Sequence, residues 1–133
     1  MRFATRLVPA RIGELGAANA YVEACAVAAG LDARTRFGLQ LALEEAFVNV
    51  CHYGYPDGPG DVAVTCETDG PRFVLEVADW GPPFDVLALP APDLTLGVAE
   101  RPIGGLGVHL IRTLARDVEY RRDEGRNVLR MMF

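Results

Sequence analysis

The chain contains no lysine, because all 13 of its basic residues are arginine. This absence excludes the phosphate-binding lysine of a P-loop, the strand lysine of an ordinary protein kinase and any Schiff-base chemistry. Runs of basic residues are also missing, and the formal net charge is −5. Both facts argue against general binding of nucleic acid or of an anionic membrane surface.

Cysteine is scarce, with three residues that are widely spaced and show no metal-type pairing. We therefore expect Cys25, Cys51 and Cys66 to be small buried side chains in a reducing cytoplasm. No segment approaches the roughly 20 apolar residues of a membrane span, and no apolar run long enough for a signal peptide follows the early arginines. These absences predict a cytoplasmic protein without membrane contact.

The chain has 133 residues, of which 50% are hydrophobic. That length suffices for one domain with a substantial core and is too short for two, so we expect a single domain over residues 1–133. The same composition excludes a disordered chain.

Apolar periodicity and turn residues predict both helices and strands along the chain. The predicted elements are a strand over Phe3–Val8 ended by Pro9, a helix over Ile12–Ala29 closed by Gly30, a helix from the N-cap Asp32 to about His52, strands around Val62–Cys66 and Phe73–Val77, a helix over Leu106–Ala115, and strands over Asp117–Arg121 and Asn127–Phe133. Residues 88–105 are rich in Pro and Gly, and so long a loop is more often a functional lid than filler. The pattern predicts an α+β fold with a mostly antiparallel sheet covered on one face.

A carboxylate and a carboxamide interrupt the second, otherwise apolar helix at Glu45 and Asn49. Their spacing places them on one helix face, about 6 Å apart along the axis. An Asn oxygen is a hard ligand that suits Mg²⁺, and a Glu one turn earlier can accept a proton from an attacking hydroxyl or water. The alternative is a polar stripe that caps a neighbouring loop or faces solvent.

A second candidate is the end of a predicted strand at Asp79-Trp80-Gly81-Pro82. A carboxylate there can accept a hydrogen bond from an exocyclic amine such as that of adenine, and a glycine lets the backbone pass close to a flat ring. The alternative is an ordinary turn, for which Asp, Gly and Pro are the usual residues.

A third candidate is the glycine-rich start of the last helix, Gly104-Gly105-Leu106-Gly107. Closely spaced glycines let successive N–H groups point at an anion, which the helix N-terminus also favours. The spacing is not G-x-G-x-x-G after a strand and no βαβ unit surrounds it, so a dinucleotide-binding fold is excluded. The alternative is a flexible connector with a glycine at the helix start.

In this order and spacing, the three segments resemble the ATP-binding domain that DNA gyrase B, sensor histidine kinases and the mismatch-repair protein MutL share, the GHKL or Bergerat type. Within that superfamily the chain most resembles the bacterial anti-sigma factor serine/threonine kinases of the RsbW and SpoIIAB type. The resemblance rests on Glu45–Asn49 with the following His52–Tyr55, on Asp79–Pro82, on Gly104–Gly107 and on the closing segment Gly125–Leu129. It extends over nearly the whole chain.

The resemblance implies a two-layer α/β sandwich that binds ATP with Mg²⁺. In that arrangement Asn49 holds Mg²⁺, Glu45 acts as the general base and Asp79 receives the adenine amine. The further nucleotide contacts that it implies are close approach of the base at Gly81, a phosphate cradle over Gly104, Gly105, Leu106 and Gly107, and the γ-phosphate at Arg101, whose planar fork suits phosphate oxygens. We expect His52, His109 and Trp80 to be packing residues.

The implied function is that of an ATP-dependent protein serine/threonine kinase acting as an anti-sigma factor. Its implied partners are a small STAS-domain antagonist, which receives phosphate on Ser or Thr, and a sigma factor or related protein, which it sequesters; the resemblance also suggests a homodimer. The alternative is a non-catalytic, nucleotide-dependent binding module that regulates a partner. Retention of Glu45 favours the kinase, because a pure binder does not need a buried base.

Overall fold

The structure, a computed structural model, describes residues 1–89 and 105–133. Most of the predicted lid, including Arg101 and Gly104, lies outside the described residues.

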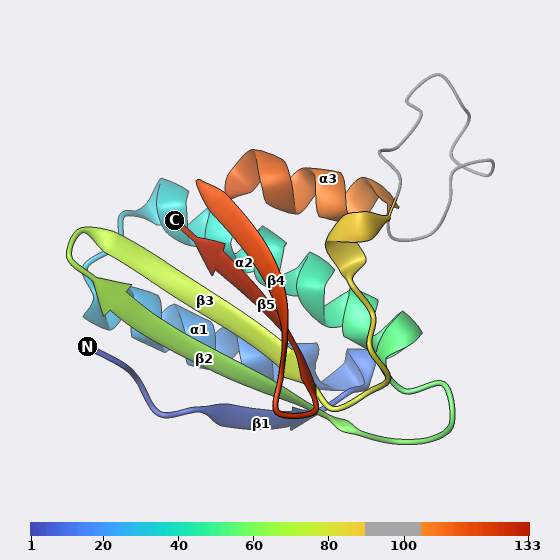
Figure 1. Cartoon of the computed structure of the whole chain (residues 1–133). Helices are drawn as coiled ribbons and strands as arrows, with labels where there is room; N and C mark the ends of the chain where they lie inside the picture. The colour runs from blue at the N-terminus through green and yellow to red at the C-terminus, as the bar shows by residue number, and fades with distance from the viewer. Residues whose placement is uncertain (90–104) are drawn as a thin grey trace.

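Within the described residues, five strands form one antiparallel sheet in the order β1-β2-β3-β5-β4. The strands are β1 Arg6–Pro9, β2 Asp61–Asp69, β3 Arg72–Asp79, β4 Asp117–Asp123 and β5 Arg126–Met132. The helices are α1 Leu15–Ala28, α2 Ala33–Asn49 and α3 Gly105–Leu114, with short helical turns at η1 Ile12–Glu14, η2 Val50–Gly54 and η3 Val86–Ala88. All three α-helices lie on one face of the sheet, which makes a two-layer sandwich (Figure 1). The predicted α+β fold is confirmed.

The core lies between the helices and the sheet. Side chains of a strand point alternately to its two faces, so every second residue of β2 and β3 faces the helices. Phe47, Leu39 and Leu43 of α2 are fully buried against Val64 and Leu75 of the sheet layer. Because α2 lies centrally in this layer, its packing fixes where its C-terminal end lies relative to the strand ends.

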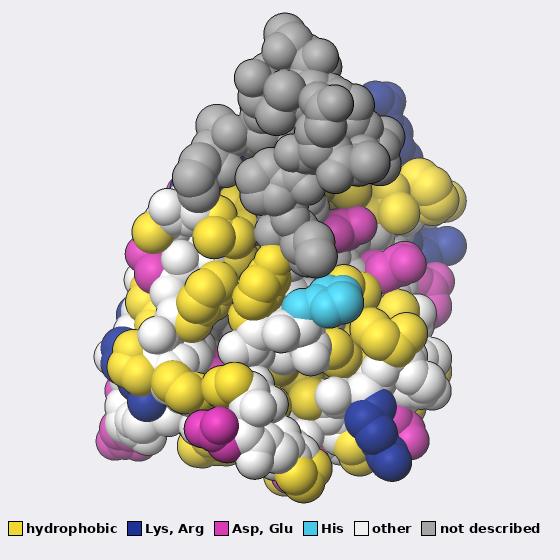
Figure 2. Space-filling model, turned by 90° about the vertical axis from the view of Figure 1, so that its right-hand side faces the viewer, with side chains coloured by type: hydrophobic (Ala, Val, Ile, Leu, Met, Phe, Trp, Pro, Cys, Tyr) yellow, Lys and Arg dark blue, Asp and Glu magenta, His cyan; other side chains and the backbone are white. Residues whose placement is uncertain are grey.

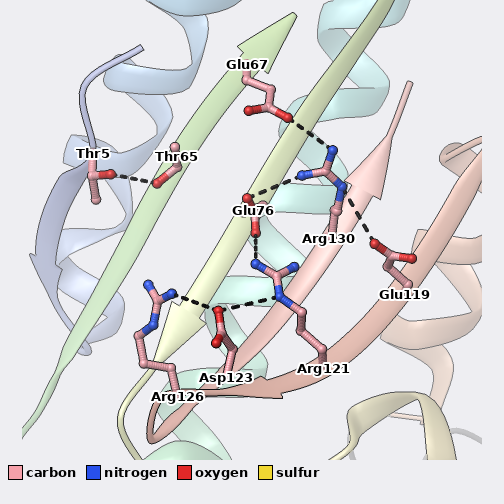
Figure 3. Close-up of polar contacts among 9 residues, drawn as sticks. All are labelled: Thr5, Thr65, Glu67, Glu76, Glu119, Arg121, Asp123, Arg126 and Arg130. Atoms are coloured by element: carbon pink, nitrogen blue, oxygen red, sulfur yellow. Dashed lines mark hydrogen bonds and ion pairs between the residues drawn. The ribbon is translucent and has the colours of Figure 1, made fainter. Parts of the chain in front are cut away.

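The opposite face of the sheet carries charged side chains that pair with one another (Figure 3). Glu76 of β3 is only 8% exposed, and its two oxygens pair with Arg121 at 3.0 Å and with Arg130 at 3.4 Å. Arg130 also lies 3.0 Å from Glu67. A nearly buried carboxylate needs such partners, because desolvation penalises an unpaired charge.

The predicted boundaries differ from the structure at several places, most clearly in the first half of the chain. The first strand is shorter than Phe3–Val8 and includes Pro9, and a short 3₁₀ turn precedes α1. The second helix begins as predicted after the N-cap Asp32, whose side chain accepts a hydrogen bond from the Thr35 N–H at 2.8 Å. It ends at Asn49, however, and the chain continues as the π-helical turn η2. Such turns often occur at functional sites.

The expectation that His52, His109 and Trp80 are packing residues is wrong. Trp80 is 47% exposed, because it lies just beyond the end of β3, whose last residue is Asp79. His109 is exposed because its neighbours on α3 supply the buried stripe, and His52 is exposed on η2.

The prediction that the cysteines are buried is confirmed for two of the three. Cys25 and Cys66 are buried and Cys51 is half-buried, and all three are free thiols. No helix among residues 1–89 and 105–133 combines the length and the apolar character that crossing a membrane would require.

Candidate functional site

A cavity opens between the C-terminal end of α2, the turn η2 and strands β3 and β5. Figure 2 views the molecule from the end where these elements meet and shows hydrophobic side chains gathered there. The lining is mainly apolar and includes Ala46, Val77 and Leu129, with polar side chains from Asn49 and Asp79. This combination of apolar walls and few polar groups is typical of small-molecule sites.

Asp79 is the buried carboxylate of this cavity, at 7% exposure. Its Oδ1 atom accepts hydrogen bonds from the Gly81 N–H at 2.9 Å and from Asn127 Nδ2 at 3.0 Å. No residue of the described ranges donates to its Oδ2 atom, so one oxygen is committed to the fold and the other can accept a hydrogen bond from a ligand.

Asn127 holds the turn that follows Asp79. The two residues are register partners in the β3–β5 pair. Besides its bond to Asp79, Asn127 Nδ2 donates to the Pro82 carbonyl at 2.9 Å, and its Oδ1 accepts from the Phe84 N–H at 3.0 Å and from the Tyr120 hydroxyl at 2.6 Å. One carboxamide therefore links the end of β3, the turn after it and β4.

Gly81 is required at its position by a close approach. A Cβ atom there would overlap the carbonyl oxygen of Gly54, at the end of η2. The neighbouring Trp80 N–H donates to the Tyr55 hydroxyl at 2.8 Å, which ties the same two segments together. Any side chain at position 81 would push the strand end away from the end of α2.

Glu45 and Asn49 lie one turn apart on α2, as the sequence predicts. Asn49 is 8% exposed and lines the cavity. Its Nδ2 atom is buried and has no hydrogen-bond partner within the described part of the chain. An unpaired buried amide costs free energy, which a ligand with acceptor oxygens would recover.

The glycine-rich start of α3 lies against Glu45. A Cβ atom on Gly107 would come within 2.5 Å of Glu45 Oε2, so a side chain there would have to displace the end of the Glu45 side chain. The α3 helix begins at Gly105. The first N–H groups of a helix have no intrahelical acceptors, and they favour an anion at the helix N-terminus.

The pKa of Glu45 is raised above the ordinary glutamate value. Burial of the carboxyl group is the larger cause, and repulsion by the neighbouring Glu44 carboxylate adds to it. A carboxylate with a raised pKa is a stronger base, which suits a group that takes a proton.

The donor set at this site fits a metal held mainly by phosphates. No group of three or more His, Cys, Asp or Glu side chains gathers as a metal cluster among residues 1–89 and 105–133. Mg²⁺ typically binds proteins through one or two oxygen ligands and completes its coordination with waters and substrate phosphates. Asn49 can supply one such ligand through its buried side-chain oxygen, and its unpartnered Nδ2 group can donate to a phosphate oxygen.

The structure thus brings together residues from all three segments that the sequence singles out: Glu45, Asn49, Asp79, Gly81 and Gly107. Gly105 and Leu106 are the first two residues of α3. Arg101 and Gly104 lie outside the described residues.

Sequence reasoning missed two features of the cavity. One is the aromatic pair Tyr53 and Phe84, whose rings stack with centroids 5.1 Å apart and planes inclined by 14°. The other is Asn127. A signal existed for both, because Tyr53 lies four residues after Asn49 and Asn127 stands before the apolar run Val128–Leu129.

Comparison with known proteins gives consistent results. A family model described as the histidine kinase-like ATPase domain matches residues 8–133. The serine-protein kinase RsbW of Bacillus cereus (strain AH187) is 32% identical over 111 residues, which are 76% of this chain and 69% of that protein. RsbW proteins of Bacillus cereus (strain Q1) and of Bacillus anthracis are 33% identical over 95 residues, 68% of this chain and 59% of theirs. The chain thus spans less than two thirds of the length of these last two relatives.

We predict that Asn127→Asp destabilises the fold in a pH-dependent way. It would place a second carboxylate about 3 Å from Asp79 Oδ1, where only one of the two can be charged. The pKa of the pair is then raised in the folded state, so the lost stability returns as pH falls through that pKa. Urea unfolding should show a loss of about 2–3 kcal/mol against wild type at pH 7.5 and a smaller one at pH 5.

The control is Tyr120→Phe, which removes one hydrogen bond to the same carboxamide without adding charge. Its loss should be about 1 kcal/mol and the same at both pH values. An equal deficit for Asn127→Asp at pH 7.5 and pH 5 would contradict the arrangement.

Proposed function

The chain belongs to the histidine kinase-like ATPase domain family, and from that membership we propose that it is an ATP-dependent protein serine/threonine kinase of the anti-sigma-factor type. The observation that carries the proposal is the position of Glu45, a carboxylate of raised pKa that contacts the glycine-rich first turn of α3, one helical turn from Asn49. A base, a carboxamide and an anion-binding helix end therefore meet beside one cavity.

In this proposal the cavity takes the adenine ring of ATP. Asp79 Oδ2 accepts a hydrogen bond from the exocyclic amine, and the glycine at position 81 keeps the base free of steric conflict with a side chain. Tyr53 and Phe84 supply aromatic surface for the ring. The mainly apolar lining excludes water from the ring and leaves the phosphates near Glu45 and α3.

The phosphates are assigned to the segment Gly104–Gly107, which includes Gly105 and Leu106, and Arg101 is assigned to the γ-phosphate. The N–H groups at the start of α3 donate to phosphate oxygens. Asn49 holds Mg²⁺ through its side-chain oxygen, and the bound cation neutralises charge on the phosphates.

Glu45 is the proposed general base. It removes the proton of a Ser or Thr hydroxyl on the protein substrate as that oxygen attacks the γ-phosphorus. The new O–P bond forms while the bond between the γ-phosphorus and the bridging oxygen breaks, so that ADP leaves and the proton stays on Glu45. This chemistry needs positioning and charge stabilisation more than covalent catalysis, and no lysine is required.

The proposed protein partners are a STAS-domain anti-anti-sigma protein, as the phosphate acceptor, and a sigma factor or related regulator, which the kinase sequesters in the cytoplasm. A homodimer is part of the same proposal. Support comes from the RsbW relatives, which are named serine-protein kinases. The rival function is a nucleotide-dependent binding module that regulates a partner without transferring phosphate.

Glu45→Gln separates the two functions. It keeps the shape of the side chain and removes the base, so transfer of labelled γ-phosphate to STAS-domain proteins should fall about 10²–10⁴-fold with ATP affinity retained. Glu119→Gln is the control, because Glu119 is an exposed carboxylate on the opposite face of the sheet, and it should keep transfer at the wild-type level. If wild-type protein binds ATP but transfers no label to any STAS-domain candidate, the kinase function is refuted and the nucleotide-dependent binding module is supported.

A second variant, Glu44→Gln, tests what raises the pKa of Glu45. The base works as a carboxylate, so the rate of transfer should rise with pH through the pKa of Glu45 and level off above it. Removing the Glu44 charge removes one of the two causes that raise this pKa, so the rising limb should move to lower pH. Single-turnover transfer rates of wild type and Glu44→Gln, measured across pH, check this prediction. If the rate rises over the same pH range in both proteins, the Glu44 charge does not raise the pKa of Glu45.

Asn49→Ala tests the metal assignment. The chain has one tryptophan, Trp80, beside the proposed adenine contact, and its fluorescence should report ATP binding. Wild type should bind ATP more tightly with Mg²⁺ than with EDTA, and Asn49→Ala should bring that ratio close to one. Asn19→Ala, on α1, should leave the ratio unchanged. An undiminished ratio in Asn49→Ala would contradict the role.

A further inference from the structure

The outer face of α2 carries a surface that neither the fold nor the nucleotide site uses. Arg34, Phe37, Leu41 and Glu44 follow one another at spacings of three, four and three residues, so they lie along one side of the helix. Phe37, at 69% exposure, is among the most exposed large hydrophobic side chains of the described residues. We call these four residues the Phe37 surface.

Two grooves of opposite charge flank this surface. The groove between α1 and α2 contains the carboxylates of Glu23 and Glu44. The groove between α2 and α3 contains the guanidinium groups of Arg34 and Arg116. Phe37 lines both grooves, so an exposed aromatic ring separates an acidic groove from a basic one.

The charges of Arg34 and Glu44 on the Phe37 surface, and of Arg116 beside it, are free to pair with a partner. Within residues 1–89 and 105–133, Arg34, Glu44 and Arg116 make no ion pair, whereas Glu23 is already paired with Arg36 at 3.0 Å. A complementary partner would therefore place a basic side chain at Glu44 and an acidic one between Arg34 and Arg116.

Two residues of this surface are unfavourable for the isolated fold. Arg34 lies in the first turn of α2, where a positive charge opposes the helix dipole. Phe37 exposes its ring to water and contributes nothing to the core. Residues that break local rules without a compensating gain in the fold mark functional positions.

The Phe37 surface is continuous with the candidate site along one helix. Phe37 and Glu45 are eight residues apart on α2, about 12 Å along its axis. Glu44, at one end of the surface, is the sequence neighbour of the proposed base. A protein held on this surface would therefore be held at a fixed distance from the phosphoryl-transfer site.

We propose that the Phe37 surface docks the protein that this kinase phosphorylates, a STAS-domain protein that places an apolar side chain on Phe37 and Leu41. A basic residue of that protein faces Glu44, and an acidic one faces Arg34 and Arg116. The inference rests on the proposed kinase function, and it adds the surface that selects the protein substrate, separate from the residues that bind ATP.

The test compares Phe37→Ser and Arg34→Glu with Val27→Ser as the matched control. Val27 is also a helix residue with an exposed apolar side chain, at 57% exposure, and it lines neither groove. Phe37→Ser should raise the KM for the STAS-domain protein about tenfold or more, as truncation of a central interface aromatic does, and leave the KM for ATP unchanged. Arg34→Glu should also raise the protein KM, although a negative charge favours the start of α2.

Each outcome decides the proposal. An unchanged protein KM in Phe37→Ser, or an equal rise in Val27→Ser, overturns it. A wild-type dimer that Phe37→Ser converts to a monomer in sedimentation also overturns it, because a second copy then covers the surface. The proposal is also overturned if Phe37→Ser weakens binding of a sigma factor and leaves binding of the STAS-domain protein unchanged.

The docking surface and the kinase function can fail separately. The dissociation constant for the same STAS-domain proteins, measured by calorimetry without transfer, reports docking alone. Wild-type binding that is lost in Phe37→Ser, without any phosphorylation, supports the surface and refutes the kinase. Absence of any wild-type binding overturns the surface.

Discussion

The site depends on keeping one carboxylate buried and satisfied. Asp79 is 7% exposed at the end of β3, and an unpaired charge there would be costly. Asn127 and the Gly81 N–H both donate to the same oxygen of this carboxylate, which aligns β5 with β3 and folds the turn back towards Gly54. The close approach at Gly81 then sets how near the end of α2 lies to the sheet. Without the close approach of Gly81 to Gly54, the end of β3 would move away from the end of α2, and Asp79 would no longer be held in its orientation at the cavity.

The second constraint is the role of α2 as the element shared by all the proposed activities. Its inner side packs in the core through Phe47 and Leu43, which holds the helix against the sheet. Its C-terminal end presents Glu45 and Asn49 to the cavity, and its outer side presents Phe37 to solvent. On the opposite face of the sheet, the charges around Glu76 pair with one another, and no helix of the described residues covers them (Figures 1 and 3). The helical layer and its end therefore carry both candidate surfaces.

Much of the fold was predictable because its signals are local. The Asp32 cap and the apolar periodicity of α2 each depend on residues a few positions apart, and the structure contains both. The strands β2 and β3 also form where they were predicted, although successive residues are buried and burial does not alternate along them. The resemblance to the family is likewise confirmed by the matching family model. The exposure of Trp80 and His109 was not predictable, because whether an aromatic or imidazole ring is buried depends on its neighbours in space. The π-helical turn η2 was missed for a related reason: its sequence continues the apolar pattern of the helix.

By itself, the sequence determined the order of the elements, the pairing of Glu45 with Asn49 on one helix face, and the exclusion of lysine-based phosphate chemistry. These follow from residue type and spacing alone. Only the tertiary structure decided that Gly107 lies against Glu45, that Asn127 anchors Asp79 from 48 residues away, and that Phe37 stands between two oppositely charged grooves. The reason is physical: contacts between distant segments depend on how helices pack on the sheet, and no local spacing records that packing.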